Sequence, residues 1–183
     1  MMKMRYLFDN PDLARMLLGN WEYDPESLDM FQYFRISANA IYPFKQKGDV
    51  HFLRFCPAEE KSGESILAEL DFIGYLRGRD YNALEAVPSK TGDVLVQKAT
   101  PWGEYYASVF KRVPGKPIGE TNLEDEVIFT MGASLGRLHV LSSEYAPREP
   151  GRWSYADVLT WIESVSRSAR AVSFGKPLSA ANP

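Results

Sequence analysis

Six short segments rich in aromatic and β-branched residues, divided into two groups by one amphipathic helix, most constrain the fold of this chain. The segments predicted as strands lie at 31–36, 40–44, 50–55, 84–89, 93–98 and 104–112. Between the third and the fourth, apolar residues from Ile66 to Leu76 recur at helical spacing and predict a helix over 61–78. Short antiparallel strands with one inserted helix are typical of an α+β fold, so a parallel βαβ sheet is not expected.

A capping signal at the start and a Pro-Gly break further on divide the chain. Asn10 and Pro11 predict the start of a first helix, and Gly19 predicts its end. Pro114-Gly115-Lys116-Pro117 is the strongest break in the sequence. We therefore expect a first lobe over 1–113 and a second segment over 114–183.

The second segment reads as a linker followed by helices. Thr121 and Glu124 form a capping-box pattern, which predicts a helix that ends near Ser142. Apolar residues at helical spacing after Ser154 predict a further helix. From about residue 173 the sequence is rich in Ser, Ala, Pro and Gly, so this tail is expected to be disordered.

Charge and cysteine content argue against several classes of protein. The 183 residues carry a formal net charge of −3, whereas binding of nucleic-acid phosphates needs a basic surface, so no nucleic-acid partner is expected. Asp9 and Asp12 interrupt the apolar residues near the N-terminus, and no apolar run of about 18 residues follows, so neither a signal peptide nor a membrane span is expected. Cys56 is the only cysteine, which fits a cytoplasmic protein.

One acidic residue lies on the apolar face of the helix predicted over 61–78. Burial of the Glu69 carboxylate is costly unless it is paired, and Arg54 on the preceding strand is the nearest candidate cation. Because side chains alternate along a strand, Arg54 shares one face with Phe52. Such a ring and guanidinium can contact a base and its phosphates while Glu69 orients the guanidinium. The alternative is a structural ion pair with Phe52 in the core.

Five motifs, in this order, resemble those of aminoglycoside phosphotransferases and their relatives, which include choline kinases, fructosamine kinases and type II homoserine kinases. They are the loop Ser37-Ala-Asn-Ala-Ile-Tyr42, the strand Phe52-Leu-Arg-Phe55, the helix Ile66-Leu-Ala-Glu-Leu-Asp-Phe-Ile73, the linker Ser108-Val-Phe-Lys-Arg-Val-Pro-Gly115 and the helix Gly132-Ala-Ser-Leu-Gly-Arg-Leu-His139. The match covers about residues 30 to 142. The resemblance implies a protein-kinase-like N-lobe, in which an antiparallel sheet of about five strands packs on one helix, followed by helices of an incomplete C-lobe.

The resemblance also implies which residues contact the phosphates of ATP or GTP, bound with Mg²⁺. Ser37, Ala38 and Asn39 would offer backbone amides to the β-phosphate, as turns with inward-pointing amides do. Arg54 would contact the α- and β-phosphates while Glu69 orients it.

For the base, the resemblance implies a pocket between the third strand and the linker. Phe52 would stack on the base, and Phe110 would close the back of the pocket. The Lys111 carbonyl and the Val113 amide would hydrogen-bond the edge of the base.

The catalytic part of the family pattern is missing from this sequence. In the family a loop close to H-G-D-x-x-x-x-N follows the Leu-His helix and supplies the catalytic aspartate and a magnesium ligand. The histidines here are His51 and His139, and neither begins such a loop. With one cysteine and no close His pair, a zinc site is not expected either. We therefore expect no catalytic residue, no metal ligand and no kinase turnover from this chain alone.

Three functions fit this pattern. The first is the ATP- or GTP-binding portion of a small-molecule phosphotransferase that acts on a hydroxylated amino compound. The second is a non-catalytic interaction module of the same fold, which would self-associate through the apolar faces of the helices after residue 115. The third is a globular α+β domain whose resemblance to the family is only architectural.

Overall fold

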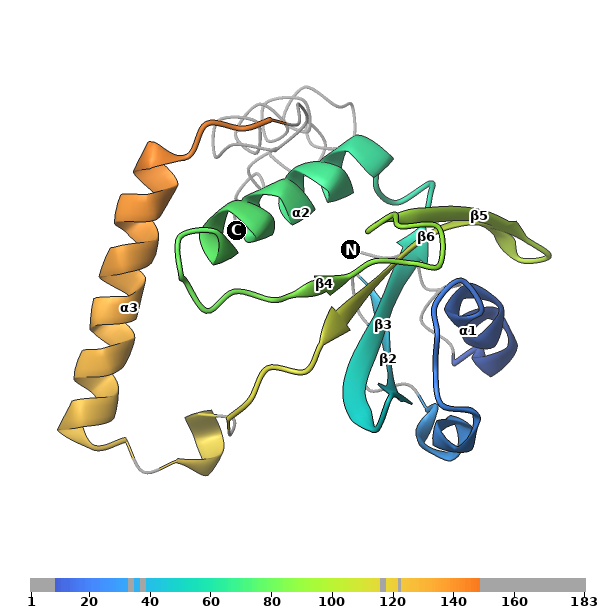
Figure 1. The fold of residues 1–183 in the computed structure, drawn as a ribbon, viewed down its shortest axis with the longest axis horizontal. Helices are drawn as coiled ribbons and strands as arrows, with labels where there is room; N and C mark the ends of the chain where they lie inside the picture. The colour runs from blue at the N-terminus through green and yellow to red at the C-terminus, as the bar shows by residue number, and fades with distance from the viewer. Residues whose placement is uncertain (1–8, 33–34, 37–38, 116–117, 122, 149–183) are drawn as a thin grey trace, which may run out of the picture. The chain divides into compact units, whose positions relative to one another are not determined.

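The computed structural model describes residues 9–32, 35–36, 39–115, 118–121 and 123–148, all within one compact unit that ends at Pro150. Its elements are, in order, α1 (Pro11–Leu18), a 3-10 helix (Pro25–Met30), β1 (Arg35–Ile36), β2 (Ala40–Gln46), β3 (Asp49–Pro57), α2 (Gly63–Arg77), β4 (Ala86–Val87), β5 (Val96–Thr100), β6 (Gly103–Lys111), a 3-10 helix (Ile118–Glu120) and α3 (Asp125–Glu144). This succession confirms the α+β fold class predicted from the sequence (Figure 1).

The strands form one antiparallel sheet in the order β1-β2-β3-β6-β4, and β5 also pairs with β6. The centre of the sheet is the pair β3 and β6, in which Phe52 lies opposite Phe110 and Arg54 opposite Ser108. The sheet thus has six strands, close to the predicted number. Its two central strands bring the predicted phosphate and base contacts side by side.

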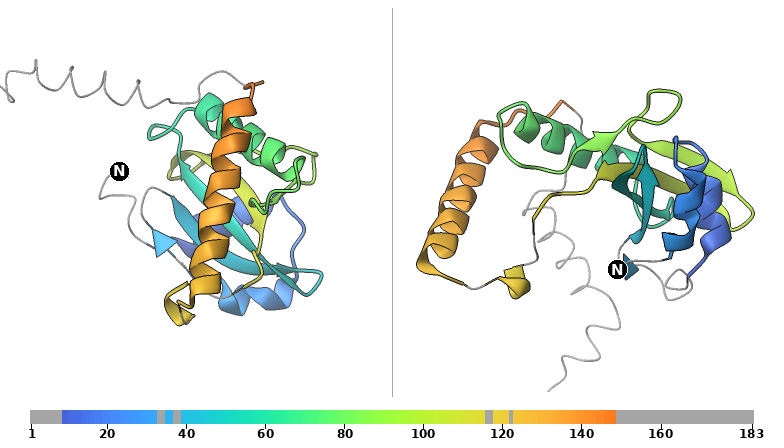
Figure 2. Two further views of the ribbon diagram at one scale, coloured as in Figure 1. Left: turned by 90° about the vertical axis from the view of Figure 1, so that its left-hand side faces the viewer. Right: turned by 60° about the horizontal axis from the view of Figure 1, so that its bottom comes forward.

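One face of the sheet is covered by α1 and the first 3-10 helix (Figures 1 and 2). The apolar residues of α1, which include the fully buried Leu17 and Leu18, pack there against Tyr42 and Leu53 of the sheet. Trp21 is also fully buried, and its indole Nε1 donates to the Val87 carbonyl at 2.9 Å. This face forms the larger of the two apolar clusters and carries no predicted nucleotide contact.

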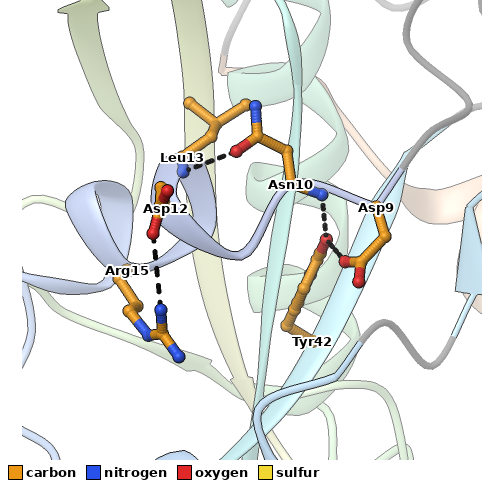
Figure 3. A network of polar contacts seen from close by, with 6 residues as sticks. All are labelled: Asp9, Asn10, Asp12, Leu13, Arg15 and Tyr42. Atoms are coloured by element: carbon orange, nitrogen blue, oxygen red, sulfur yellow. Dashed lines mark hydrogen bonds and ion pairs between the residues drawn. The ribbon is translucent and has the colours of Figure 1, made fainter.

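The start of α1 follows the predicted capping signal. The Asn10 side chain accepts a hydrogen bond from Leu13 N at 3.0 Å, and Pro11 occupies the first helical position. The hydroxyl of Tyr42 donates to the Asp9 carboxylate at 2.5 Å and accepts from Asn10 N at 3.0 Å (Figure 3). One tyrosine of β2 therefore fixes the start of α1 to the sheet.

A tight turn joins β2 to β3, between the strands predicted over 40–44 and 50–55. Lys47 and Gly48 both have positive φ, 53° and 83°, which suits the right-handed twist of a two-residue hairpin. Their amides donate to the two oxygens of the Asp24 carboxylate at 2.8 and 2.7 Å. These two bonds lower the pKa of Asp24, with the bond from Gly48 as the larger cause.

The other face of the sheet is covered by α2. Its N-cap is Ser62, whose hydroxyl accepts from Ser65 N at 3.2 Å, so the helix begins close to the predicted start. Ile66 and Leu70 pack with Cys56 and Phe110 in a second, smaller apolar cluster. Phe52, Arg54 and Cys56 alternate with Leu53 and Phe55 along β3, so the first three residues face α2 as the pleat predicts.

Two details of the predicted elements are wrong. The capping box at Thr121 is not formed, because α3 begins at Asp125 after Glu124, and the Thr121 hydroxyl instead donates to the Ile118 carbonyl at 2.8 Å. The strands predicted over 84–89 and 93–98 are shorter or shifted. Between them, the Ser89 hydroxyl accepts from the amides of Thr91 and Asp93, which closes a compact loop.

In the part of the chain that the structure describes, no helix is long and apolar enough to cross a lipid bilayer. The helix predicted after Ser154 and the tail from about residue 173 lie outside the described residues. The predicted division into 1–113 and 114–183 stays a prediction.

Candidate functional site

The central feature of the site is an ion pair between β3 and α2. Arg54 Nη1 lies 2.5 Å from Glu69 Oε1, and the Arg54 guanidinium carbon lies 4.8 Å from the centre of the Phe110 ring. Arg54 therefore contacts an acid on the helix and an aromatic ring on β6 at the same time. Both contacts lie on the α2 face of the sheet, as the sequence predicts for Arg54 and Glu69.

The two charged groups differ in their exposure. The side chain of Arg54 is 14% exposed, whereas that of Glu69 is 40% exposed. The sequence predicts a buried carboxylate, and this is wrong: the Arg54 guanidinium lies over the Phe110 ring, whereas the Glu69 side chain remains 40% exposed. Solvent around Glu69 screens the ion pair, so the pair contributes little to the stability of the fold. Its main effect is that Glu69 orients the Arg54 guanidinium.

Aromatic side chains line the sheet beside the ion pair. Phe52 lies directly opposite Phe110 in the β3–β6 register, two residues before Arg54 on the same face. Phe110 is 4% exposed, whereas Phe52 is partly exposed. We call Phe52, Arg54, Glu69 and Phe110 the Arg54 site, which combines two aromatic side chains with one cation that lies over the more buried ring.

The chain leaves the sheet next to the Arg54 site. Lys111 N donates to the Glu85 carbonyl at 2.9 Å, whereas Arg112 N donates to the Val50 carbonyl at 3.1 Å. Backbone groups of successive strand residues point to opposite edges, so the Lys111 carbonyl lies on the Glu85 side. Val113 follows Arg112 just after the end of β6. Lys111 and Val113 have exposed side chains, as expected for residues that act through their backbone.

A charged cluster links this exit to the end of α2, and sequence reasoning missed it. The Glu85 carboxylate pairs with Lys111 Nζ and, at 2.8 Å, with Arg77 Nη2. The hydrogen bond from Lys111 is the main cause of a lowered pKa at Glu85. The three side chains are 36–52% exposed, so no local apolar pattern could have indicated the cluster.

Of the predicted phosphate loop, Ser37 and Ala38 lie outside the described residues. Asn39 is described, is partly buried and directly precedes β2. Its neighbour Ala40 lies opposite Phe55 of β3, one residue beyond Arg54. The end of the loop is thus next to the strand that carries Arg54.

The other reactive side chains do not form a second site. His51 is buried, its ring packs on Phe44 with centroids 5.7 Å apart, and its Nδ1 lies 3.0 Å from the Asp49 carbonyl. Burial raises the pKa of the Cys56 thiol, which makes it a poor nucleophile. Among the described residues, no group of three or more His, Cys, Asp or Glu side chains could hold a metal ion.

Comparison with known proteins gives distant relatives and a clear structural likeness. No family model matches the sequence. Amicoumacin kinase of Bacillus subtilis is 19% identical over 125 residues, which are 68% of this chain and 37% of that protein. An uncharacterized protein of Synechocystis is 24% identical over 136 residues, which are 73% of this chain and 37% of that protein.

Two solved structures share the arrangement of elements. Amicoumacin kinase hAmiN, in complex with AMP-PNP, Ca²⁺ and Ami, matches with a TM-score of 0.73 and 20% identity over 84% of this chain. The chain has the fold of the part of this kinase that it matches. The microcompartment-associated aminopropanol kinase matches with a TM-score of 0.66 and 22% identity over 80% of this chain. These two likenesses confirm the predicted kinase-like fold class.

The likeness covers only part of each relative. The chain spans 46% and 45% of the two solved structures and 37% of each curated relative. It therefore corresponds to less than half the length of the proteins that it matches.

Proposed function

We propose that this chain forms the nucleotide-binding part of a small-molecule kinase. The observation that carries the proposal is the Arg54 site, where a guanidinium paired with Glu69 at 2.5 Å lies over the Phe110 ring, and Phe52 lies opposite Phe110 on the neighbouring strand. A planar guanidinium with fixed orientation suits phosphate oxygens, and aromatic rings suit a base. The shared fold with kinases, one of which is in complex with AMP-PNP, supports ATP as the nucleotide.

In this proposal, each group of the site has a defined role. Phe52 stacks on the base, and Phe110 closes the back of the pocket while it also supports the Arg54 guanidinium. The Lys111 carbonyl accepts from an exocyclic amine, and the Val113 amide donates to a ring nitrogen. Glu69 orients Arg54 toward the α- and β-phosphates, so that the nucleotide is held in one position before any transfer occurs.

The transfer itself needs groups beyond the Arg54 site. A divalent cation such as Mg²⁺ supplies charge neutralisation at the β- and γ-phosphates when it is bound with ATP. The described residues offer no cluster of acids for such a cation, so its protein ligands and the catalytic base are expected elsewhere in the complete enzyme. The names of the relatives, amicoumacin kinase and aminopropanol kinase, favour a hydroxylated amino compound as the phosphate acceptor.

Thermal unfolding with nucleotide tests the proposal. A ligand at about 100 times its Kd stabilises the folded state by about 2.7 kcal/mol, so millimolar Mg-ATP should raise the Tm measurably. Arg54→Ala should lose most of this rise. Arg15→Ala is the matched control, because Arg15 pairs with Asp12 on α1, which covers the opposite face of the sheet. Absence of any rise in the wild-type chain would contradict nucleotide binding.

A second function, self-association as a non-catalytic module, is favoured by one observation. Several large apolar side chains of α3 are more than half exposed, namely Ile128, Phe129, Leu135 and Val140. Exposed apolar faces of this kind often mark contact surfaces. Measurement of the molar mass in solution by light scattering tests this function, and a monomer across the micromolar range would rule it out.

A further inference from the structure

The outer side of α2 is held by the C-terminal end of α3 and the residues that follow it. The Tyr145 hydroxyl donates to Asp71 Oδ2 at 2.5 Å, and Arg148 N donates to the same oxygen at 3.1 Å. The Tyr145 ring packs against both Phe72 and Tyr75, with centroid distances of 4.9 and 5.0 Å. We call these contacts, made by Asp71, Phe72, Tyr75 and Tyr145, the α2–α3 latch.

The Asp71 part of the latch lies on the opposite side of α2 from Glu69. Asp71 follows Glu69 by two positions, which on an α-helix is a rotation of about 200°. Glu69 accordingly pairs with Arg54 of the sheet, whereas Asp71 pairs with Tyr145 beyond the end of α3. Tyr75 extends the latch by one turn, because its hydroxyl donates to the Leu141 carbonyl at 3.1 Å. The helix that carries Glu69 is thus held from two sides.

The sheet by itself gives α2 few apolar contacts. Among the described residues, the cluster beneath α2 contains four buried ones, Cys56, Ile66, Leu70 and Phe110, with five partly buried ones packed against it. The cluster on the opposite face of the sheet contains fourteen buried residues of the described part of the chain and four partly buried ones. A helix on a small core can shift or rotate at low cost. A shift of about 1 Å would lengthen the 2.5 Å contact of Glu69 with Arg54 beyond the usual range of hydrogen-bond distances and weaken it.

We propose that Tyr145 and Asp71 are positioning residues for the nucleotide site. The latch holds α2 in the position from which Glu69 orients Arg54, so contacts beyond the end of α3 set the geometry of the phosphate-binding guanidinium. The effect on nucleotide binding rests on the proposed function. The effect on the Arg54–Glu69 pair does not, since it concerns the protein without ligand.

The first test measures the ion pair directly in the full chain. The Nε–Hε signal of Arg54 is assigned by NMR with an Arg54→Lys variant, and Glu69→Gln gives its position when the charged partner is absent. Tyr145→Phe, which removes one oxygen, should move the signal toward the Glu69→Gln position, and Asp71→Asn should do so independently. Tyr81→Phe is the control, because Tyr81 contacts Ser134 of α3 at 3.1 Å but lies beyond the end of α2. An Arg54 signal that is unchanged in Tyr145→Phe and Asp71→Asn overturns the proposal.

The second test measures Mg-ATP binding by calorimetry. Since hydrogen bonds to ionised carboxylates are among the stronger ones, Tyr145→Phe should weaken binding roughly five-fold. In a Glu69→Gln background the same substitution should have no further effect, because the latch acts through Glu69. An equal loss in both backgrounds would show that Tyr145 supports only general stability, which contradicts the proposal. If the wild-type chain binds no nucleotide, the proposed function fails and the NMR result still decides the latch.

Discussion

Substitution of Tyr42 by Phe should destabilise the chain through one hydroxyl group. The Tyr42 ring is fully buried, so Phe conserves the packing and leaves no cavity. The change removes the bond to the Asp9 carboxylate at 2.5 Å and the bond from Asn10 N at 3.0 Å (Figure 3). The start of α1 would then be joined to the sheet by apolar packing and by fewer hydrogen bonds.

The magnitude follows from the exposure of the partners. A hydrogen bond contributes about 0.5–1.5 kcal/mol net, and one to a charged group about 1.5–3 kcal/mol. Asp9 is exposed, so water can replace the lost donor and the charged term must be discounted. We expect a loss of about 1–2 kcal/mol in the free energy of unfolding, which lowers the Tm by about 3–6 °C for a chain of this size.

The assay is urea unfolding followed by circular dichroism, with the m-value as a check that the unfolded state is unchanged. Tyr23→Phe is the matched control, because Tyr23 packs against the same core and its hydroxyl makes no hydrogen bond with any described residue. The free energy of unfolding should be lower for Tyr42→Phe than for Tyr23→Phe by at least about 0.5 kcal/mol. Equal stability of the two variants would refute the role assigned to the Tyr42 hydroxyl.

Three further predictions concern the turn, the core and the base edge. Asp24→Asn should lower the Tm at neutral pH, because the amides of the β2–β3 turn depress the pKa of Asp24 in the folded state. The difference in Tm between Asp24→Asn and wild type should shrink as the pH falls below the ordinary pKa of 3.8. A difference in Tm that does not change with pH would contradict this. Leu17 is fully buried, so Leu17→Ala should lower the free energy of unfolding in urea by about 2–5 kcal/mol. Its neighbour Met16 is 37% exposed, so Met16→Ala should lower it by about 0.5 kcal/mol or less. Val113→Pro, which deletes the backbone donor, should weaken Mg-ATP binding about three- to ten-fold, and Val113→Ala, which keeps it, should not; equal affinities would exclude the Val113 amide from the base contact.

Much of the fold follows from local sequence patterns. Asn10 and Pro11 define the start of α1, and the Lys47-Gly48 turn sets the β2–β3 register. That register and the pleat of β3 place Arg54 on the α2 face, where Glu69 meets it. In each case the physical cause acts over a few residues or over adjacent strands, so the sequence pattern contains it.

The features that sequence reasoning missed depend on contacts between distant segments. Tyr145 meets Asp71 across 74 positions, and neither residue belongs to a pattern that would indicate the other. The exposure of Glu69 is also not predicted correctly, because a helical wheel shows which face a residue shares but not how much of its side chain solvent reaches. The start of α3 differs for a similar reason, since Thr121 bonds to Ile118 instead of capping the helix.

The most direct test of the account compares ATP with adenosine. If Arg54 contacts the phosphates, calorimetry should show that Arg54→Ala weakens ATP binding at least about ten-fold, as expected when a charge-assisted bond is lost, and leaves adenosine binding nearly unchanged. Equal weakening of both ligands, or no weakening of either, would contradict the assignment of Arg54 as the phosphate-binding residue of this chain.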